Sequence, residues 1–251
     1  MTLVLALHGF LGQGSDFGFV ETQLFRQFSK AEVNFWAPDL FSINGLWGPD
    51  KPMQEWAQHL NSFVEKEFGE SKKVVVGYSM GGRLAMELLR DRPNLWSGSL
   101  MISSNILPIR EEERSARQFW DSRWAERFRR EIWHDVLSEW NRLPIFLPGP
   151  VEAVTRDEED FDREGLAHAL LQWSPIHQRD IDKATLDGWQ NAHFVVGLKD
   201  SKYIAIQERV AELNSSLHLH QISGGHRLLQ ENREWLAQKM CELIRSTSQE
   251  V

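Results

Sequence analysis

Residues 72–91, KKVVVGYSMGGRLAMELLRD, decide the fold. The three consecutive valines, Val74 to Val76, predict a short strand that is buried on both faces. The glycines around Ser79 then reverse the chain, and apolar residues recur at helical spacing after it, at Leu84, Ala85, Leu88 and Leu89. A serine in a G-x-S-x-G turn between a strand and a helix is typical of a nucleophile elbow. The alternative is a glycine-rich connection in another kind of α/β protein, and the lack of a Walker lysine argues against it.

Composition restricts the class of protein. The 251 residues can bury a substantial core, as one large domain or as a domain with an insertion. The net charge of −8 argues against a nucleic-acid partner, because no basic excess is present to neutralise phosphates. The single cysteine, Cys241, excludes an internal disulfide and a cysteine-built metal site. No residues have metal-ligand spacing, so neither a metal nor an organic cofactor is implied.

The sequence pattern contains no targeting or membrane segment. Met1 to Leu7 is apolar but has no basic region, and it runs directly into His8-Gly9, as a first buried strand does. No apolar run approaches the length of a membrane span. We therefore expect a soluble, cytoplasmic protein without a membrane partner, and we expect a monomer.

Buried-strand and helix patterns alternate along the chain. Further strands are expected at residues 3–7, 33–37, 98–102, 193–198 and 217–222. Helices are expected at residues 20–28, 53–67, 204–213 and 231–244. This alternation predicts an α/β fold with a mostly parallel, doubly wound sheet.

Residues 106–186 differ from the rest of the chain. Residues 111–142 are highly charged and contain Trp120, Trp124, Trp133 and Trp140 at spacings that suit amphipathic helices. Residues 157–173 predict one more helix. We interpret 106–186 as a helical cap inserted into a core formed by residues 1–105 and 187–251.

A serine becomes a nucleophile or a base only when a histidine takes its proton and an acid orients that histidine. Enzymes with this elbow carry the serine, the acid and the histidine in that chain order. Asp200 follows a late predicted strand, and His226 follows the last one after a glycine pair. Ser79, Asp200 and His226 are therefore the candidate catalytic triad.

Other histidines and acids fit these roles less well. His8 directly follows the first predicted strand, which favours a structural role in shaping the next loop. His218 and His220 alternate within a strand, so we expect surface or packing residues. Asp187 would be the acid only if residues 193–198 were not a strand.

Arg83 lies four residues after Ser79, in the first turn of the elbow helix. A cation at this position opposes the helix dipole. One interpretation is a solvent-exposed arginine whose aliphatic stem packs on the sheet. The other is a guanidinium that points into a pocket and binds a substrate carboxylate through two parallel hydrogen bonds. The chemistry alone leaves both open.

These segments together resemble the α/β-hydrolase superfamily. His8-Gly9-Phe10-Leu11-Gly12 resembles the loop that supplies one oxyanion N–H group in these enzymes, with Phe10 as the backbone donor. The resemblance implies an α/β-hydrolase fold whose cap is inserted where residues 106–186 stand.

Within that superfamily the chain resembles the 2-succinyl-6-hydroxy-2,4-cyclohexadiene-1-carboxylate synthases of menaquinone biosynthesis. The shared segments are G-Y-S-M-G-G-R-L-A-M at the elbow, Arg117-Gln118 to Phe128 in the cap, Trp140, Asp200-Ser201-Lys202-Tyr203 and Gly225-His226 with Glu231-Asn232. The resemblance implies a lyase that eliminates pyruvate from 2-succinyl-5-enolpyruvyl-6-hydroxy-3-cyclohexene-1-carboxylate, with the triad acting as the base. The partner would then be a small-molecule polycarboxylate.

The same resemblance assigns further site residues. It implies that Arg83 and Arg117 bind substrate carboxylates and that Tyr78 and Trp140 are pocket aromatics. It also implies that Met80 joins Phe10 in donating backbone N–H groups to the developing negative charge. Without the resemblance, Arg117 and Trp140 would be interpreted as parts of a charged cap helix with an ordinary packing tryptophan.

One segment departs from the family pattern. Leu171 falls where the family usually has another cap arginine, while Gln178 fits the family's glutamine. Arg179 is a candidate to supply the missing charge from another direction.

Two other functions remain as alternatives. One is a carboxylesterase or carbon–carbon bond hydrolase that forms an acyl-enzyme on Ser79. The other is a catalytically silent binding fold, which the complete triad argues against. Arg83 and Arg117 favour the lyase, because a neutral ester pocket has no use for two arginines.

Overall fold

The computed structural model describes residues 1–42, 47–147 and 155–248. Within these ranges six strands form one sheet in the order β2-β1-β3-β4-β5-β6, and each neighbouring pair is parallel. The strands are β1 (Thr2–Leu7), β2 (Val33–Trp36), β3 (Lys72–Tyr78), β4 (Gly98–Ile102), β5 (Ala192–Gly197) and β6 (His218–Ile222). The predicted parallel, doubly wound sheet is confirmed.

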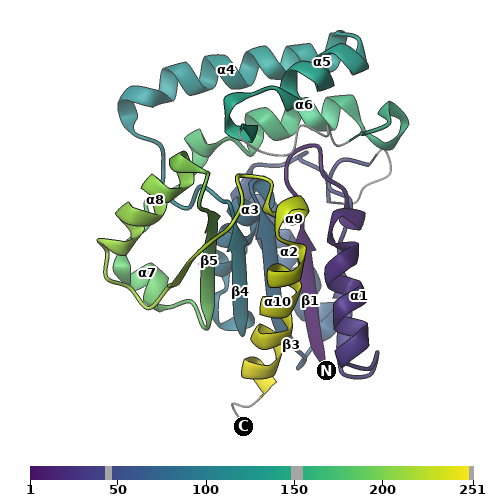
Figure 1. Ribbon diagram of the computed structural model, residues 1–251, viewed down its shortest axis with the longest axis vertical. Coiled ribbons are helices and arrows are strands. Elements are labelled where there is room, and N and C mark those ends of the chain that lie inside the picture. Colours follow the sequence, from purple (N-terminus) through teal and green to yellow (C-terminus); the bar gives the residue numbers. More distant parts are fainter. Residues whose placement is uncertain (43–46, 148–154, 249–251) are drawn as a thin grey trace.

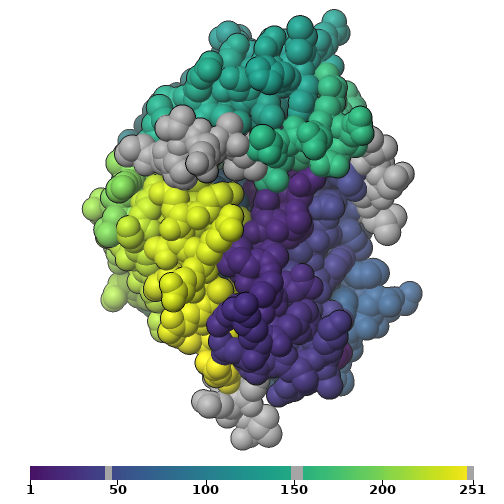
Figure 2. Space-filling view, turned by 45° about the vertical axis from the view of Figure 1, so that its right-hand side comes forward, coloured from purple at the N-terminus to yellow at the C-terminus, as the bar shows by residue number. Residues whose placement is uncertain are grey.

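Helices cover both faces of this sheet (Figure 1). On one face α1 (Gly18–Gln27) packs beside α10 (Arg233–Ser248), and Figure 2 shows these N-terminal and C-terminal segments side by side. The other face carries α2 (Met53–Phe68), α3 (Met80–Asp91) and α8 (Ser201–Ala211). Val74 and Val76 belong to the core with α1 and α10, whereas Val75 belongs to the core with α2 and α3. The valine run is therefore buried on both faces, as its sequence predicts.

Two predicted helices are interrupted. The helix predicted at 157–173 is wrong in its first part, because Phe161 is extended and the Asp162 carboxylate caps α6 (Arg163–Gln172) by accepting the Glu164 N–H at 3.0 Å. The closing helix predicted at 231–244 is divided into α9 (Leu228–Glu231) and α10, because Asn232 has a non-helical φ of −141°. The described ranges also contain α7 (Lys183–Asp187) and 3₁₀ turns at Gly14–Phe17, Pro93–Leu95, Pro144–Phe146, Glu158–Asp160 and Pro175–His177.

A helical layer lies over the carboxyl end of the sheet (Figure 1). It contains α4 (Glu111–Arg130), α5 (Trp133–Asn141) and α6, and Figure 2 shows it covering the core. Arg129 of α4 makes two hydrogen bonds to the Glu164 carboxylate of α6, at 2.8 and 2.7 Å. We call this layer the cap; its limits at residues 106 and 186 stay a prediction.

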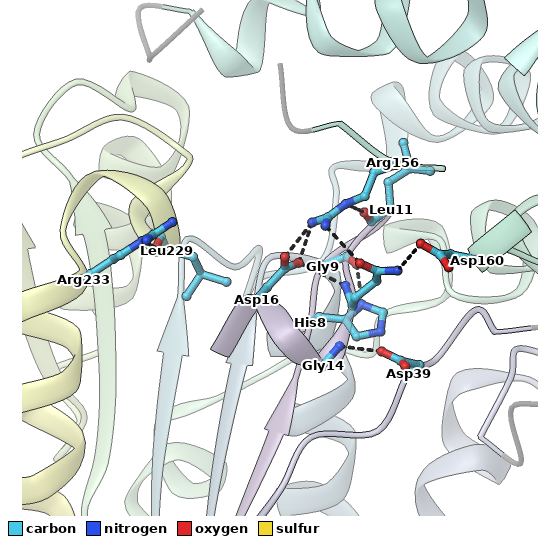
Figure 3. A network of polar contacts seen from close by, with 11 residues as sticks. His8, Gly9, Leu11, Gly14, Asp16, Asp39, Arg156, Asp160, Leu229 and Arg233 are labelled. Atoms are coloured by element: carbon cyan, nitrogen blue, oxygen red, sulfur yellow. Dashed lines mark hydrogen bonds and ion pairs between the residues drawn. The ribbon is translucent and has the colours of Figure 1, made fainter. Parts of the chain in front are cut away.

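Arg156 joins a cap segment to the core (Figure 3). Its guanidinium donates to both carboxylate oxygens of Asp16 at 2.7 Å and to the Leu11 carbonyl at 2.7 Å. The Arg156 and Asp16 side chains are only 10% and 15% exposed, so solvent screens this pair weakly. The contact therefore ties the cap to the loop that follows β1.

Among the described helices, none combines the length and the apolar character needed to cross a membrane.

Candidate active site

Ser79 occupies a strained turn between β3 and α3. Its φ of 52° and ψ of −109° lie in a region that non-glycine residues rarely adopt. The Ser79 N–H donates to the Ile102 carbonyl of β4 at 2.8 Å, which holds the turn against the sheet. A Cβ on Gly81 would lie 2.0 Å from the Leu7 carbonyl oxygen, so the close approach of α3 to β1 requires glycine there. This geometry lifts the serine above the carboxyl end of the sheet.

The structure brings Ser79, His226 and Asp200 together in one line of contacts. Ser79 Oγ lies 3.1 Å from His226 Nε2, and His226 Nδ1 lies 2.8 Å from Asp200 Oδ2. Asp200 follows β5 and His226 follows β6, and parallel strands bring both to the same edge of the sheet as the elbow. The side chains of His226 and Asp200 are buried. A nucleophile, a base and an orienting acid have this arrangement.

The competing histidines and acid have other partners. His218 stacks on His193 with ring centroids 4.6 Å apart, and His220 Nε2 lies 2.9 Å from His193 Nδ1. Asp187 forms an ion pair with Lys183 and accepts the Ser216 N–H at 2.7 Å. His218 is exposed and His220 is half-buried, so they are surface and packing residues, as the sequence predicts, and Asp187 does not contact His226.

His8 fixes the loop that carries the first oxyanion candidate. Its Nε2 accepts the Leu40 N–H at 2.9 Å, so the proton is on Nδ1, which donates to the Gly9 carbonyl at 2.8 Å. Burial lowers the pKa of His8, which favours this neutral form. Because carbonyl and N–H point in opposite directions across a trans peptide, this bond turns the Phe10 N–H away from His8. The predicted structural role of His8 is confirmed.

Phe10 and Met80 are the two backbone donors predicted from the sequence. Within the described ranges neither residue gives its N–H to an acceptor. Met80 begins α3, and the first N–H groups of a helix have no intrahelical partner. Both residues line the same cavity as Ser79. These two groups are available to an anionic oxygen near Ser79.

A cavity of about 440 Å³ lies between the cap and the end of the sheet. Of the predicted site residues, Ser79, His226, Phe10, Met80, Tyr78, Arg83, Arg117 and Trp140 line it, and Asp200 lies behind His226. Sequence reasoning did not assign several other lining residues, which include Asn105, Trp120, Phe146, Lys202 and Tyr203. Lys202 and Tyr203 stood beside Asp200 in a segment used for the family resemblance. Asn105 and Phe146 had no signal, because they come from loops that only the fold brings to the site.

Arg83 is a buried cation to which the described residues give no carboxylate partner. Its residue is 6% exposed, and its guanidinium donates to the Trp173 carbonyl of the cap. Among the described residues no carboxylate lies within ion-pair distance of it. Burial, followed by the charge of Arg117, lowers the pKa of Arg83 to about 10. Desolvation of an unneutralised charge is unfavourable, and an anionic ligand in the cavity would offset it.

Arg117 is held in place by a carboxylate. Its Nε donates to Asp121 Oδ2 at 2.8 Å, and Nη2 lies 2.8 Å from Oδ1. Asp121 is 1% exposed and also accepts the Ser174 hydroxyl at 2.6 Å. The guanidinium lies over the Trp120 ring, 4.8 Å from its centroid. Asp121 therefore balances one positive charge and orients the arginine at the cavity wall.

Lys202 adds a third cation to the cavity. Its side chain is exposed at the rim, and desolvation followed by the charge of Arg117 lowers its pKa. The described lining holds Arg83, Arg117 and Lys202 and no carboxylate, and these three cations outnumber Asp121 and Asp200 behind the lining, so the cavity is positive although the whole chain carries −8.

The segment that departs from the family pattern contains Leu171, Gln178 and Arg179, and none of the three lines this cavity. Arg179 pairs with Glu87 at 2.6 Å and is not a lining residue, so the expectation that it supplies the missing charge is not supported. Gln178 donates to the Asn105 carbonyl at 2.6 Å and thereby supports a cavity residue. Leu170, one residue before Leu171, lines the cavity. In the described part of the chain no group of three or more His, Cys, Asp or Glu side chains could hold a metal ion.

Comparison with known proteins identifies the family. The model of the alpha/beta hydrolase family matches residues 3–239. The chain belongs to the α/β-hydrolase family. It is 30% identical over 174 residues to the 2-succinyl-6-hydroxy-2,4-cyclohexadiene-1-carboxylate synthase of Citrobacter koseri, covering 68% of each chain. To the synthase of the same name from Enterobacter sp. (strain 638) it is 29% identical over 247 residues, covering 95% of this chain and 90% of that one.

Solved structures show the same α/β-hydrolase fold. The S. aureus protein MenH superposes with a TM-score of 0.79 at 19% identity, over 98% of this chain and 94% of that chain. A thermophilic esterase from Thermogutta terrifontis superposes with a TM-score of 0.75 at 20% identity, over 98% and 90%. Since both a MenH and an esterase share this fold, the fold alone does not choose the reaction.

Proposed function

We propose that this α/β-hydrolase is a lyase of menaquinone biosynthesis. It eliminates pyruvate from 2-succinyl-5-enolpyruvyl-6-hydroxy-3-cyclohexene-1-carboxylate and leaves 2-succinyl-6-hydroxy-2,4-cyclohexadiene-1-carboxylate. The observation that carries the proposal is the desolvated Arg83 guanidinium, unneutralised among the described residues, in the cavity that also holds Ser79 and His226. The sequence similarity to synthases of that name, over 95% of this chain for one of them, supports it.

In the proposed reaction Ser79 and His226 act as one base. His226 Nε2 takes the hydroxyl proton while the serine oxygen removes a ring proton. The electrons of the broken C–H bond form the second ring double bond. The C–O bond to the enolpyruvyl group breaks, and its electron pair leaves with the oxygen as the enolate of pyruvate, which takes the proton from His226 Nε2 and so restores the neutral histidine. Asp200 holds His226 in the tautomer that this sequence needs.

The surroundings fit a substrate with several carboxylates. Arg83, Arg117 and Lys202 would bind these groups and so hold the ring against Ser79. The N–H groups of Phe10 and Met80 would stabilise the enolate-like charge that develops beside the breaking C–H bond. Tyr78 and Trp140 would pack on the ring. A cytoplasmic location and a monomeric state stay predictions.

A carboxylesterase or carbon–carbon bond hydrolase is the second candidate. The contact of 3.1 Å between Ser79 Oγ and His226 Nε2, with two available N–H donors nearby, also suits an acyl-enzyme. In that reaction Ser79 would become covalently acylated, whereas in the lyase it would only relay a proton.

Two substrates offered side by side separate these functions. The purified protein receives the enolpyruvyl substrate or p-nitrophenyl acetate, and release of pyruvate or nitrophenol is followed. We expect pyruvate release, abolished in Ser79→Ala and in His226→Ala. Ester turnover without pyruvate release contradicts the lyase. Mass spectrometry of the intact protein during turnover would detect an acyl adduct on Ser79, which favours the second candidate.

A further inference from the structure

A second, smaller cavity adjoins the active-site cavity. It has a volume of about 60 Å³ and shares Phe10, Tyr78, Trp140 and Phe146 with the larger one. One water occupies roughly 10–15 Å³ on this measure, so the small cavity has room for about four waters or for a carboxylate on a short carbon chain. Its polar lining includes Arg227, Asn141, Gln230, Asp16 and Arg156. None of these side chains has a role in the reaction proposed above.

Among the described lining residues, Arg227 is the one cation with no carboxylate within ion-pair distance, and Glu231 acts on it only from farther away. The residue is 6% exposed, and its guanidinium donates to Asn141 Oδ1 at 2.6 Å and lies 4.3 Å from the Phe146 ring centroid. Burial lowers the pKa of Arg227, and the negative charge of Glu231 opposes this only in part. A desolvated guanidinium with N–H donors to spare is a site for an anion.

Arg156 does not share this property. Its charge is balanced by both oxygens of Asp16, and its Nε is engaged by the Leu11 carbonyl (Figure 3). The Arg156–Asp16 pair is therefore a neutral wall of the small cavity. The net positive charge that faces the cavity comes from Arg227.

Two further polar atoms on the lining lack partners. Asn141 Nδ2 and Gln230 Oε1 are buried, and neither forms a hydrogen bond within the described residues. The Arg227 guanidinium donates to Asn141 Oδ1, so Nδ2 of the same amide is a donor next to that guanidinium. The oxygen and nitrogen of the Gln230 amide are distinguished only by their hydrogen bonds, so the amide can be turned over. In that orientation Nε2 takes the place of the unpartnered Oε1 and offers a second donor. Together with the Arg227 guanidinium, these polar atoms offer hydrogen-bonding capacity to an anion in the small cavity.

We propose that Arg227, Asn141 and Gln230 form a second anion subsite, which binds the carboxylate of a small organic acid beside His226. The carboxylate has two potential sources. It is either a free short acid such as pyruvate or one carboxylate arm of a larger substrate held in the main cavity. The second source rests on the proposed function; the first does not, because binding is measurable without turnover.

The test compares three forms of the full chain: wild type, Arg227→Met and Arg233→Met. Arg233 is the matched control, because it lies on the same C-terminal segment, is exposed, and contacts the Leu229 carbonyl and the Phe19 ring away from the small cavity (Figure 3). Binding of ¹³C-labelled pyruvate is followed by NMR at constant ionic strength. We expect wild type and Arg233→Met to bind pyruvate alike and Arg227→Met to bind it at least about tenfold more weakly.

A kinetic measurement identifies the source of the carboxylate. If wild type does not bind free pyruvate but Arg227→Met raises KM for the enolpyruvyl substrate about tenfold at nearly constant kcat, the subsite holds a substrate arm. If neither pyruvate binding nor KM depends on Arg227, the subsite is overturned. If pyruvate binding depends on Arg227 but no form releases pyruvate from the substrate, the subsite stands and the lyase function fails.

A melting experiment excludes a merely structural role. Removing a buried, unneutralised cation is expected to leave the melting temperature of Arg227→Met equal to or above that of wild type. A lower melting temperature together with unchanged pyruvate binding assigns Arg227 to structure alone and overturns the proposal.

Discussion

Arg83 of the elbow helix donates to the backbone carbonyl of Trp173 in the cap, and this carbonyl is the only hydrogen-bond partner that the described residues give its guanidinium. A carbonyl dipole compensates a buried charge far less than a carboxylate does. Arg83 is thus a costly residue for folding and a suitable one for binding an anion. The interpretation of Arg83 as a solvent-exposed helical arginine is wrong, because the cap covers it.

We expect Arg83→Met to be more stable and less active than wild type. The lowered pKa of about 10 corresponds to roughly 3 kcal/mol of unfavourable free energy at neutral pH, from desolvation and then from repulsion by Arg117. The free energy of unfolding in urea should rise by about 1–3 kcal/mol. The value of kcat/KM for the carboxylated substrate should fall by about 10- to 100-fold. Arg90→Met is the control on the same helix, since Arg90 bonds to the Arg179 and Asp180 carbonyls outside the cavity. Loss of stability with full activity would contradict this interpretation.

Local sequence was sufficient for much of the fold and for placing Ser79, Asp200 and His226 where their side chains make contact. The valine run, the elbow glycines and the positions of Asp200 and His226 after strands depend on short-range pattern, and parallel strands align their ends. The helix breaks at Asp162 and Asn232 were missed because the apolar pattern stays periodic across them. Asp162 is the N-cap residue of α6, and Asn232 is a single non-helical residue between α9 and α10.

Sequence could not predict the balance of charge at the site. Nothing in the spacing shows that Arg117 is neutralised by Asp121 while Arg83 is not, because both facts depend on how the cap packs on the core. The same holds for Arg227, whose burial depends on contacts with Asn141 and Phe146, over 80 residues away in the chain. Such contacts between distant segments are outside the reach of local pattern.

We expect Asp200→Asn to fold normally and to lose about 10³- to 10⁴-fold in kcat. The Asp200 carboxylate accepts from His226 Nδ1 at 2.8 Å, which leaves Nε2 free to take the Ser79 proton. An asparagine can offer an N–H to Nδ1 and so stabilise the wrong tautomer. Asp187→Asn is the control, and steady-state kinetics with circular dichroism of each variant is the measurement. Equal losses in both variants would remove Asp200 from the triad.

The Arg156–Asp16 pair is expected to couple the cap to the core energetically. Arg156→Met, Asp16→Asn and the double variant form a cycle. Each single change should lower the free energy of unfolding by about 1–3 kcal/mol, because it leaves a mostly buried charge or its partner unpaired. The coupling energy should be about 0.5–3 kcal/mol, measured by urea unfolding. Strictly additive losses would show that the contact contributes nothing of its own.

His193 lies near the amino end of β5, at the end of the sheet opposite the elbow, and its contacts hold it neutral. Its Nε2 donates to Asn191 Oδ1 at 2.9 Å, because Asn191 Nδ2 is itself a donor to Ser246 Oγ. Nδ1 therefore accepts from His220 Nε2 at 2.9 Å. Burial, followed by the charges of Lys239, His218 and His220, lowers the pKa of His193 to about 3.

This lowered pKa predicts acid sensitivity of the fold. Above pH 6.5, the ordinary pKa of histidine, His193 is neutral in both the folded and the unfolded chain and does not affect stability. Between pH 6.5 and about 3 only the unfolded chain takes up the proton, so the free energy of unfolding falls as the pH falls. The slope from one such group is at most about 1.4 kcal/mol per pH unit.

Urea unfolding at pH 7 and pH 5 tests this contribution. We expect wild type to lose about 2 kcal/mol more stability over this interval than His193→Gln, which keeps an amide for Asn191 but cannot be protonated. His134→Gln is the control, since the His134 side chain is 90% exposed, and it should lose stability as wild type does. His8 and His220 also have lowered pKa values and add to the slope of every form, so the difference between variants isolates His193. An equal loss in wild type and His193→Gln would contradict the assignment of the acid sensitivity to this end of the sheet.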